Sequence, residues 1–220
     1  MYNYQSSTDN FEITDIVVSD ALNLIIAGHQ YIKKTGTEII DHFGMLTVWK
    51  FPLWDLNSTE FVMNFPFPNG ISKLLYSETD KELIIGADNG KLYIASMEDV
   101  MNHPIEAENP TATLFMSRIV DIIWLTQDKI LAAIGDDNYL KIFDYNKQKI
   151  VSGGSLSKRL KDDTLTCIKM DNDKRIYLST RENSVIIYEI VEPKYQFKYL
   201  FTVFLESIKS PIRSLTFYKG

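Results

Sequence analysis

Residues 117–125 read Ser-Arg-Ile-Val-Asp-Ile-Ile-Trp-Leu, and the same apolar pattern recurs four more times along the chain. In each copy the third residue is apolar, a second apolar residue follows three positions later, and a third follows two positions after that. We number each copy from position 1 to position 9. The copies follow one another at nearly equal intervals after a longer first interval, which indicates a repeat protein. They span residues 11–19, 69–77, 117–125, 163–171 and 210–218.

Each complete repeat continues with three more strand-like runs, separated by clusters of Asp, Asn, Gly and Lys. Four antiparallel strands in about 40–45 residues are typical of a β-propeller blade, because stacked blades bury the faces that one small sheet leaves open. The sequence therefore predicts an all-β propeller in an incomplete ring, with a β-sandwich as the alternative. The expected four-stranded blades cover residues 11–67, 68–116, 117–155 and 163–207, with the start of a fifth at 210–220.

The ends of the third strands carry a more specific pattern. They read Trp49-Lys50, Ala95-Ser96, Phe143-Asp144 and Tyr188-Glu189. Together with the spacing of the first strands, this resembles the WD-repeat propeller family, whose third strand ends in Trp-Asp. The family's Gly-His pair is missing throughout, so the resemblance implies a divergent member held together mainly by apolar packing. The fold hosts many unrelated roles, so it implies little about function.

Composition excludes several classes of protein. The 220 residues carry a net charge of −6, so attraction of the whole molecule to nucleic acid is not expected. Cys167 is the only cysteine, which rules out an internal disulfide and any Cys-x-x-Cys site. No uncharged apolar run is long enough to span a membrane. We expect an intracellular protein, cytoplasmic or cytoskeletal, with the cilium among the places where WD-repeat relatives occur.

Catalytic and cofactor motifs are missing from the sequence. It contains no phosphate-binding glycine loop and no His-Glu-x-x-His. His29 and His42 could hold a metal ion with Asp41 or Glu38 as a third ligand, but paired histidines in a long loop are more often solvated. We expect no enzyme, metal or cofactor. A propeller enzyme would instead need charged first-strand residues facing the axis, and the candidates are Asp15, Lys73, Asp121 and Arg213.

Two connections are longer than is needed to join neighbouring strands of a blade. Long loops on a rigid scaffold often bind partners. The two connections are His29–Gly44, which lengthens the first repeat, and Glu98–Pro110. The His29–Gly44 loop is expected at the same end of the disc as residues 152–162. The basic residues of both segments would then form a patch suited to an acidic or phosphorylated ligand. The candidate partner-binding residues are His29, Tyr31, Lys33, Lys34, Trp54, Lys158, Arg159 and Lys161.

These features together predict a non-catalytic WD-repeat-like scaffold that binds other proteins, as a subunit of a larger assembly. The alternatives are a structural subunit of a cytoskeletal or ciliary complex and a propeller enzyme with an axial site. We further expect residues 1–220 to be a piece of a longer chain. Four blades and a lone fifth strand would leave apolar blade faces open to water, so further blades or a neighbouring subunit should close the ring.

Overall fold

Tight hairpins build the chain, and their turns depend on residues in the left-handed backbone region. Asn23, Lys81, Lys129 and Lys174 occupy the same place after each first strand, with φ between 53° and 61°. Their carbonyls accept the backbone N–H groups of Phe51, Met97, Tyr145 and Ile190, which ties each first turn to the end of the third strand. The computed structural model describes residues 11–35, 38–51, 60–102, 109–126, 129–160, 162–205 and 210–217.

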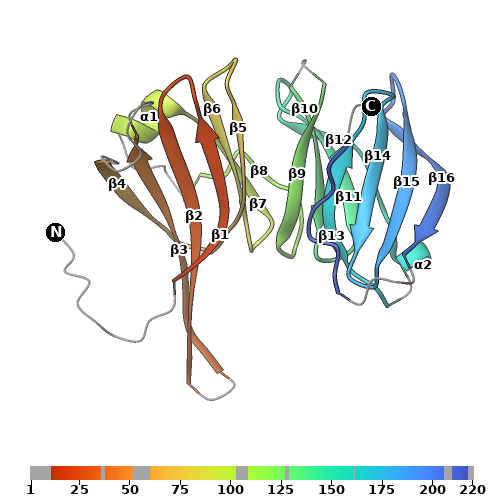
Figure 1. Cartoon of the computed structure of the whole chain (residues 1–220), viewed down its shortest axis with the longest axis horizontal. Helices are drawn as coiled ribbons and strands as arrows, with labels where there is room; N and C mark the ends of the chain where they lie inside the picture. Colours follow the sequence, from red (N-terminus) through yellow and green to blue (C-terminus); the bar gives the residue numbers. More distant parts are fainter. Residues whose placement is uncertain are drawn as a thin grey trace. The chain divides into compact units, whose positions relative to one another are not determined.

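The first two sheets are antiparallel, with the strands in sequence order. Sheet 1 contains β1 (Phe11–Ser19), β2 (Leu24–Thr35), β3 (Glu38–Lys50) and β4 (Glu60–Phe67) (Figure 1). Sheet 2 contains β5 (Ile71–Ser77), β6 (Glu82–Ala87), β7 (Lys91–Ser96) and β8 (Ala112–Thr113), with helix α1 (Met97–Asn102) between β7 and β8.

The other two sheets repeat the same order. Sheet 3 contains β9 (Ile119–Thr126), β10 (Ile130–Gly135), β11 (Tyr139–Asp144) and β12 (Lys149–Ser155), followed by helix α2 (Ser157–Leu160). Sheet 4 contains β13 (Leu165–Met170), β14 (Arg175–Thr180), β15 (Ser184–Val191) and β16 (Gln196–Phe204). Four four-stranded antiparallel sheets confirm the predicted all-β fold class.

The chain forms two compact units. Unit 1 comprises residues 1–88 and 93–110, and unit 2 comprises residues 89–92 and 111–220. In unit 1, apolar residues of sheet 1 such as Leu46 and Phe65 pack with Ile71 and Leu74 of β5. In unit 2, apolar residues of sheet 3 pack in the same way with Leu165 and Ile168 of β13. Each core is therefore a face of one sheet laid against the next, as stacked blades require.

The expected loop His29–Gly44 is wrong, because most of it continues the strands. β2 pairs with β3 as far as Thr35 and Glu38, whereas β1 pairs with β2 only to Tyr31 and β4 pairs with β3 only to Gly44. The ends of β2 and β3 therefore extend beyond β1 and β4 as a two-stranded ribbon (Figure 1). The lysines and threonines of this segment are typical of a loop. Backbone pairing between β2 and β3 nevertheless keeps the segment extended.

Two other expectations need correction. The connection Glu98–Pro110 begins with helix α1, and residues 103–108 lie outside the described part. The fourth strand expected at Thr111–Met116 is reduced to Ala112–Thr113, because the N–H groups of Leu114 and Phe115 both bond to the carbonyl of Gly90. Residues 210–217 have no strand pairing, and the start of a fifth blade there stays a prediction.

Candidate partner-binding surfaces

A bulge at position 4 shapes every first strand. The pairing of each first strand with the second strand skips Thr14, Ser72, Val120 and Thr166 in turn. A β-bulge leaves one residue unpaired and redirects its side chain. In some of these strands, the side chains at positions 4 and 5 reach beyond their own sheet.

In unit 1 these two positions join sheet 1 to sheet 2. The Thr14 hydroxyl donates to the carbonyl of Ile71 at 2.6 Å, and Asp15 Oδ2 accepts the backbone N–H of Leu74 at 2.9 Å. The Lys73 ammonium lies 3.1 Å from the same Asp15 oxygen. Asp15 and Lys73, considered in the sequence as axial catalytic candidates, form part of the contact between the sheets.

Unit 2 contains the same two kinds of contact, at two different joins. Asp121 is 4% exposed, and its Oδ2 accepts the backbone N–H of Ile168 at 3.0 Å. The Thr166 hydroxyl donates to the carbonyl of Ile212, as Thr14 does to Ile71. Residues 210–217 therefore stand beside sheet 4 where a next first strand would begin. Their Arg213 is exposed.

Two predicted site residues of the first repeat, His29 and Tyr31, are buried in unit 1. His29 and Tyr31 are only 8% and 5% exposed on β2, and the Tyr31 ring packs on Phe43 with centroids 4.6 Å apart. Burial lowers the pKa of His29. The other histidine considered for a metal site, His42, has its Nε2 2.5 Å from the carboxylate of Asp88, which directly follows β6.

The predicted basic patch is not assembled within either unit. Lys33 and Lys34 lie on the β2 ribbon of unit 1, opposite Asp41 and Ile39, whereas Lys158 and Arg159 lie on α2 of unit 2. Arg159 stacks its guanidinium 3.5 Å above the centre of the Tyr199 ring. The two units hold separate basic residues, so a patch formed by both stays a prediction. Trp54 and Lys161 lie outside the described residues.

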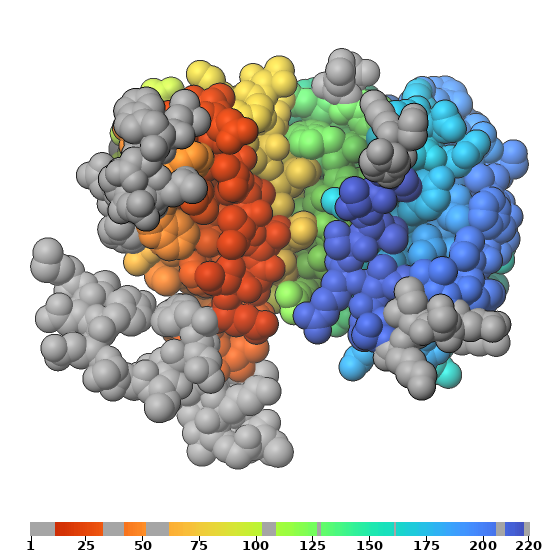
Figure 2. All heavy atoms as spheres, viewed as in Figure 1, coloured from red at the N-terminus to blue at the C-terminus, as the bar shows by residue number. Residues whose placement is uncertain are grey.

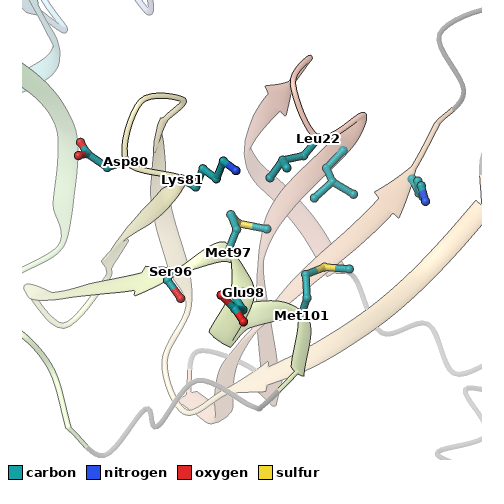
Figure 3. A pocket seen from close by; sticks show the side chains of 9 residues that line it. Leu22, Asp80, Lys81, Ser96, Met97, Glu98 and Met101 are labelled. Atoms are coloured by element: carbon teal, nitrogen blue, oxygen red, sulfur yellow. The ribbon is translucent and has the colours of Figure 1, made fainter.

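Unit 1 contains a groove that the sequence analysis missed. Its volume is about 470 Å³, and side chains of Leu22, Met97 and Met101 converge on it (Figure 3). The turn between β1 and β2 supplies Leu22, and α1 supplies both methionines. Methionine is flexible and polarisable, which suits a surface that adapts to a partner. The other lining residues are Leu24, Lys50, Asp80, Lys81, Ser96 and Glu98.

A local signal for this groove is present in the sequence. Ser96 Oγ accepts the backbone N–H of Asp99 at 3.0 Å and donates to the Asp99 carboxylate, which caps the first turn of α1. This Ser-x-x-Asp arrangement resembles the capping box that marks helix starts. Met97 and Met101 are four residues apart and so share one face of α1. Recognising the cap would have predicted a helix with an apolar face in place of a loop.

In the described part of the chain, no three His, Cys, Asp or Glu side chains are grouped so as to hold a metal ion. The helices described are too short to cross a membrane.

Comparison with known proteins identifies the fold. No family model matches the sequence, and no curated protein matches it. Among solved structures, the Neurospora crassa Pan2 WD40 domain is similar over 86% of this chain, with a TM-score of 0.59 and 15% identity. U3-55K and the RRP9 WD40 repeats each match 90% of the chain at 12% identity, with TM-scores of 0.62 and 0.63. This chain covers 49–53% of those three chains, so it spans about half their length.

Proposed function

We propose that this chain, which has the sheet architecture of WD40 propeller domains, is a non-catalytic scaffold that binds other proteins. The observation that carries the proposal is the use of Asp15 and Asp121 at the bulges. Their carboxylates accept backbone N–H groups of the next sheet. An axial enzyme would need such groups facing a substrate, whereas here they hold sheets together. Binding is then left to connections and grooves at the sheet ends, as on other rigid scaffolds.

The groove of unit 1 is the contact surface that we assign to a partner. Its apolar centre, made by Leu22 and the two methionines of α1, suits an apolar side chain of a protein. Lys81 and Glu98 add opposite charges to the lining. A partner segment with one apolar anchor between charged residues matches this arrangement. An apolar pocket with a polar rim is also the usual form of an interaction hot spot.

The test compares two Met→Lys variants expressed in the native cells. Met101→Lys places a charge in the groove, whereas Met116→Lys changes a residue that is 94% exposed in unit 2. Proteins that copurify with the wild type should be lost from Met101→Lys and kept by Met116→Lys. A thermal melt of each purified variant separates loss of binding from loss of folding. Retention of every partner by a folded Met101→Lys protein would refute the assignment.

We also propose that the scaffold works inside the cell as a subunit of a larger assembly. Apolar side chains on the outermost strand of sheet 4 support this, since Phe201 is 54% and Phe204 is 70% exposed. Cytoskeletal and ciliary complexes are the classes of assembly that the WD-repeat resemblance suggests. Sedimentation of a native lysate tests the proposal, because migration at the mass of a free monomer would contradict it. Fluorescence microscopy of the tagged protein tests the location.

A further inference from the structure

Three segments of unit 1 surround the groove, and hydrogen bonds connect them. We call them the rim segments: residues 19–24 (the turn after β1), residues 77–82 (the turn after β5) and residues 96–102 (Ser96 and α1). The buried Ser19 donates its hydroxyl to Glu78 at 3.1 Å, and the backbone N–H of Met97 donates to the carbonyl of Lys81 at 2.8 Å. The two turns lie side by side at the surface of unit 1 (Figure 2). The apolar centre of the groove is therefore held by a connected frame.

The rim segments carry an excess of negative charge. Their six carboxylates belong to Asp20, Glu78, Asp80, Glu82, Glu98 and Asp99, and Lys81 is their one cation. All of these carboxylates except that of Glu82 belong to exposed residues. Lys50 adds one more cation to the lining. The surroundings of the groove thus remain negative and attract cationic side chains.

The corresponding segments of unit 2 show that the fold does not require this excess. They are residues 125–130, 171–175 and 189–195, and the N–H of Ile190 donates to Lys174 there as that of Met97 does to Lys81. These segments carry five carboxylates and four cations, so their charges nearly balance. Several of the carboxylates form ion pairs, as Glu192 does with Lys174 at 2.9 Å. The negative charge is therefore a feature of the groove in unit 1.

We propose that this groove binds a basic segment of another protein, one that carries a large apolar residue with Lys or Arg on both sides. The apolar residue packs between Leu22, Met97 and Met101, and the cationic side chains lie over Asp80 and Glu98. A buried anchor supplies most of the affinity of such a contact, while rim charges speed association and disfavour acidic segments. The inference rests on the scaffold function and the groove assigned above, and adds the chemistry of the partner.

A second copy of this chain is less suited to the groove than a separate protein. Its turn between β11 and β12 carries Lys147 and Lys149 beside Ile150, which is 42% exposed. The Lys147 ammonium, however, already lies 2.7 Å from Asp144 Oδ2, and binding through this lysine would give up that pair. The proposal therefore commits to a different protein, and self-association counts against it.

Fluorescence anisotropy with synthetic peptides tests the charge and the anchor of the partner. The probe is a labelled peptide with one leucine between lysines, and two further peptides replace the leucine by serine or every lysine by glutamate. We expect the purified chain to bind the probe, the serine peptide about tenfold more weakly, and the glutamate peptide not measurably. Raising the salt from about 50 mM to about 500 mM should weaken binding of the probe. Equal binding of the lysine and glutamate peptides, or no binding of the probe, would overturn the proposal.

A pair of matched double variants separates the rim from the net charge of the chain. Asp20→Asn/Glu98→Gln removes two exposed rim charges and should weaken binding of the probe about threefold to tenfold. Asp136→Asn/Glu182→Gln removes the same charge from exposed residues of unit 2 and should bind as the wild type does. Equal weakening in the two variants would mean that the peptide follows net charge alone, which would overturn the proposal. Urea midpoints of both variants establish that they are folded.

Copurification distinguishes failure of this inference from failure of the scaffold function. Partners that are lost from Met101→Lys but kept undiminished by Asp20→Asn/Glu98→Gln would overturn the basic segment and leave the groove assignment intact. Partners that a folded Met101→Lys protein retains would refute the groove assignment itself. Self-association of the purified chain, measured by sedimentation and abolished by Glu98→Lys, would identify a second copy as the occupant and overturn the proposal.

Discussion

Asp121 and Ile168 are linked across the join between sheets 3 and 4. Asp121 Oδ2 accepts the Ile168 backbone N–H at 3.0 Å, while Oδ1 accepts the N–H of Ile122 at 2.9 Å. Asp15 and Leu74 have the same relationship in unit 1. One carboxylate therefore satisfies a backbone group of the next sheet, and the bulge beside it makes this reach possible.

Replacing Asp121 by alanine should strongly destabilise the chain. The substitution leaves two N–H groups without their acceptor at a site that is 4% exposed. We expect a loss of about 2–4 kcal/mol in the free energy of unfolding, since hydrogen bonds to a charged group contribute about 1.5–3 kcal/mol each. Urea titration followed by circular dichroism measures the loss. Asp136→Ala, at an exposed turn residue, is the control and should change little; equal effects of the two variants would contradict the structural role of Asp121.

Gly44→Ala should also destabilise unit 1. A Cβ at Gly44 would meet the backbone carbonyl of Asn69 at less than van der Waals distance and the backbone nitrogen of Ile71 at 2.9 Å. Backbone atoms in a packed join cannot move aside cheaply, so we expect a loss of about 1–3 kcal/mol, as for other overpacked sites. Thermal unfolding of Gly154→Ala provides the comparison, because a Cβ there meets nothing within 4 Å. If the Gly44→Ala protein melts at the same temperature as the wild type, the close approach of the Asn69 and Ile71 backbone to Gly44 is refuted.

The stability of the chain should depend on pH through His29. Burial lowers its pKa below the usual value of 6.5, so the unfolded chain takes up a proton more readily than the folded chain. The contribution of His29 to stability is therefore complete above about pH 6.5 and decreases as the pH falls toward the lowered folded pKa.

Urea midpoints between about pH 7.5 and about pH 5.5 measure this dependence. The midpoint of the wild type should fall with acidification, and the decrease should be smaller in His29→Gln, whose side chain does not titrate. Identical pH profiles for the two proteins would show that His29 does not contribute.

Arg159 and Lys158 are adjacent on α2 and should differ in their effect. The Arg159 guanidinium stacks on the Tyr199 ring, whereas Lys158 is exposed on the same short helix. Arg159→Ala should cost about 0.5–1 kcal/mol, as expected for an exposed cation–π contact, and Lys158→Ala should cost almost nothing. Differential scanning calorimetry compares the two midpoints. Equal melting temperatures of the two variants would show that the stacking does not measurably stabilise the chain.

The strand order follows from local features of the sequence. Apolar positions at fixed spacing define the first strands, and residues such as Lys174 and Asn138 take up the left-handed conformation that tight turns require. Both signals operate within a few residues, so the four hairpin-built sheets were predictable without any knowledge of distant contacts. The same local logic failed for residues 29–44 and for α1, where a polar composition was interpreted as loop.

The sequence by itself thus determined the repeat, the strands and the class of fold. Only the tertiary structure decided how the chemically notable residues are used. Asp15 and Asp121 became acceptors between sheets, and His29 became a buried strand residue, because each contacts partners distant in the sequence. The exposure of Ile16 was decided in the same way, since its pattern matches that of buried Leu74 and only the presence of a neighbouring sheet separates the two.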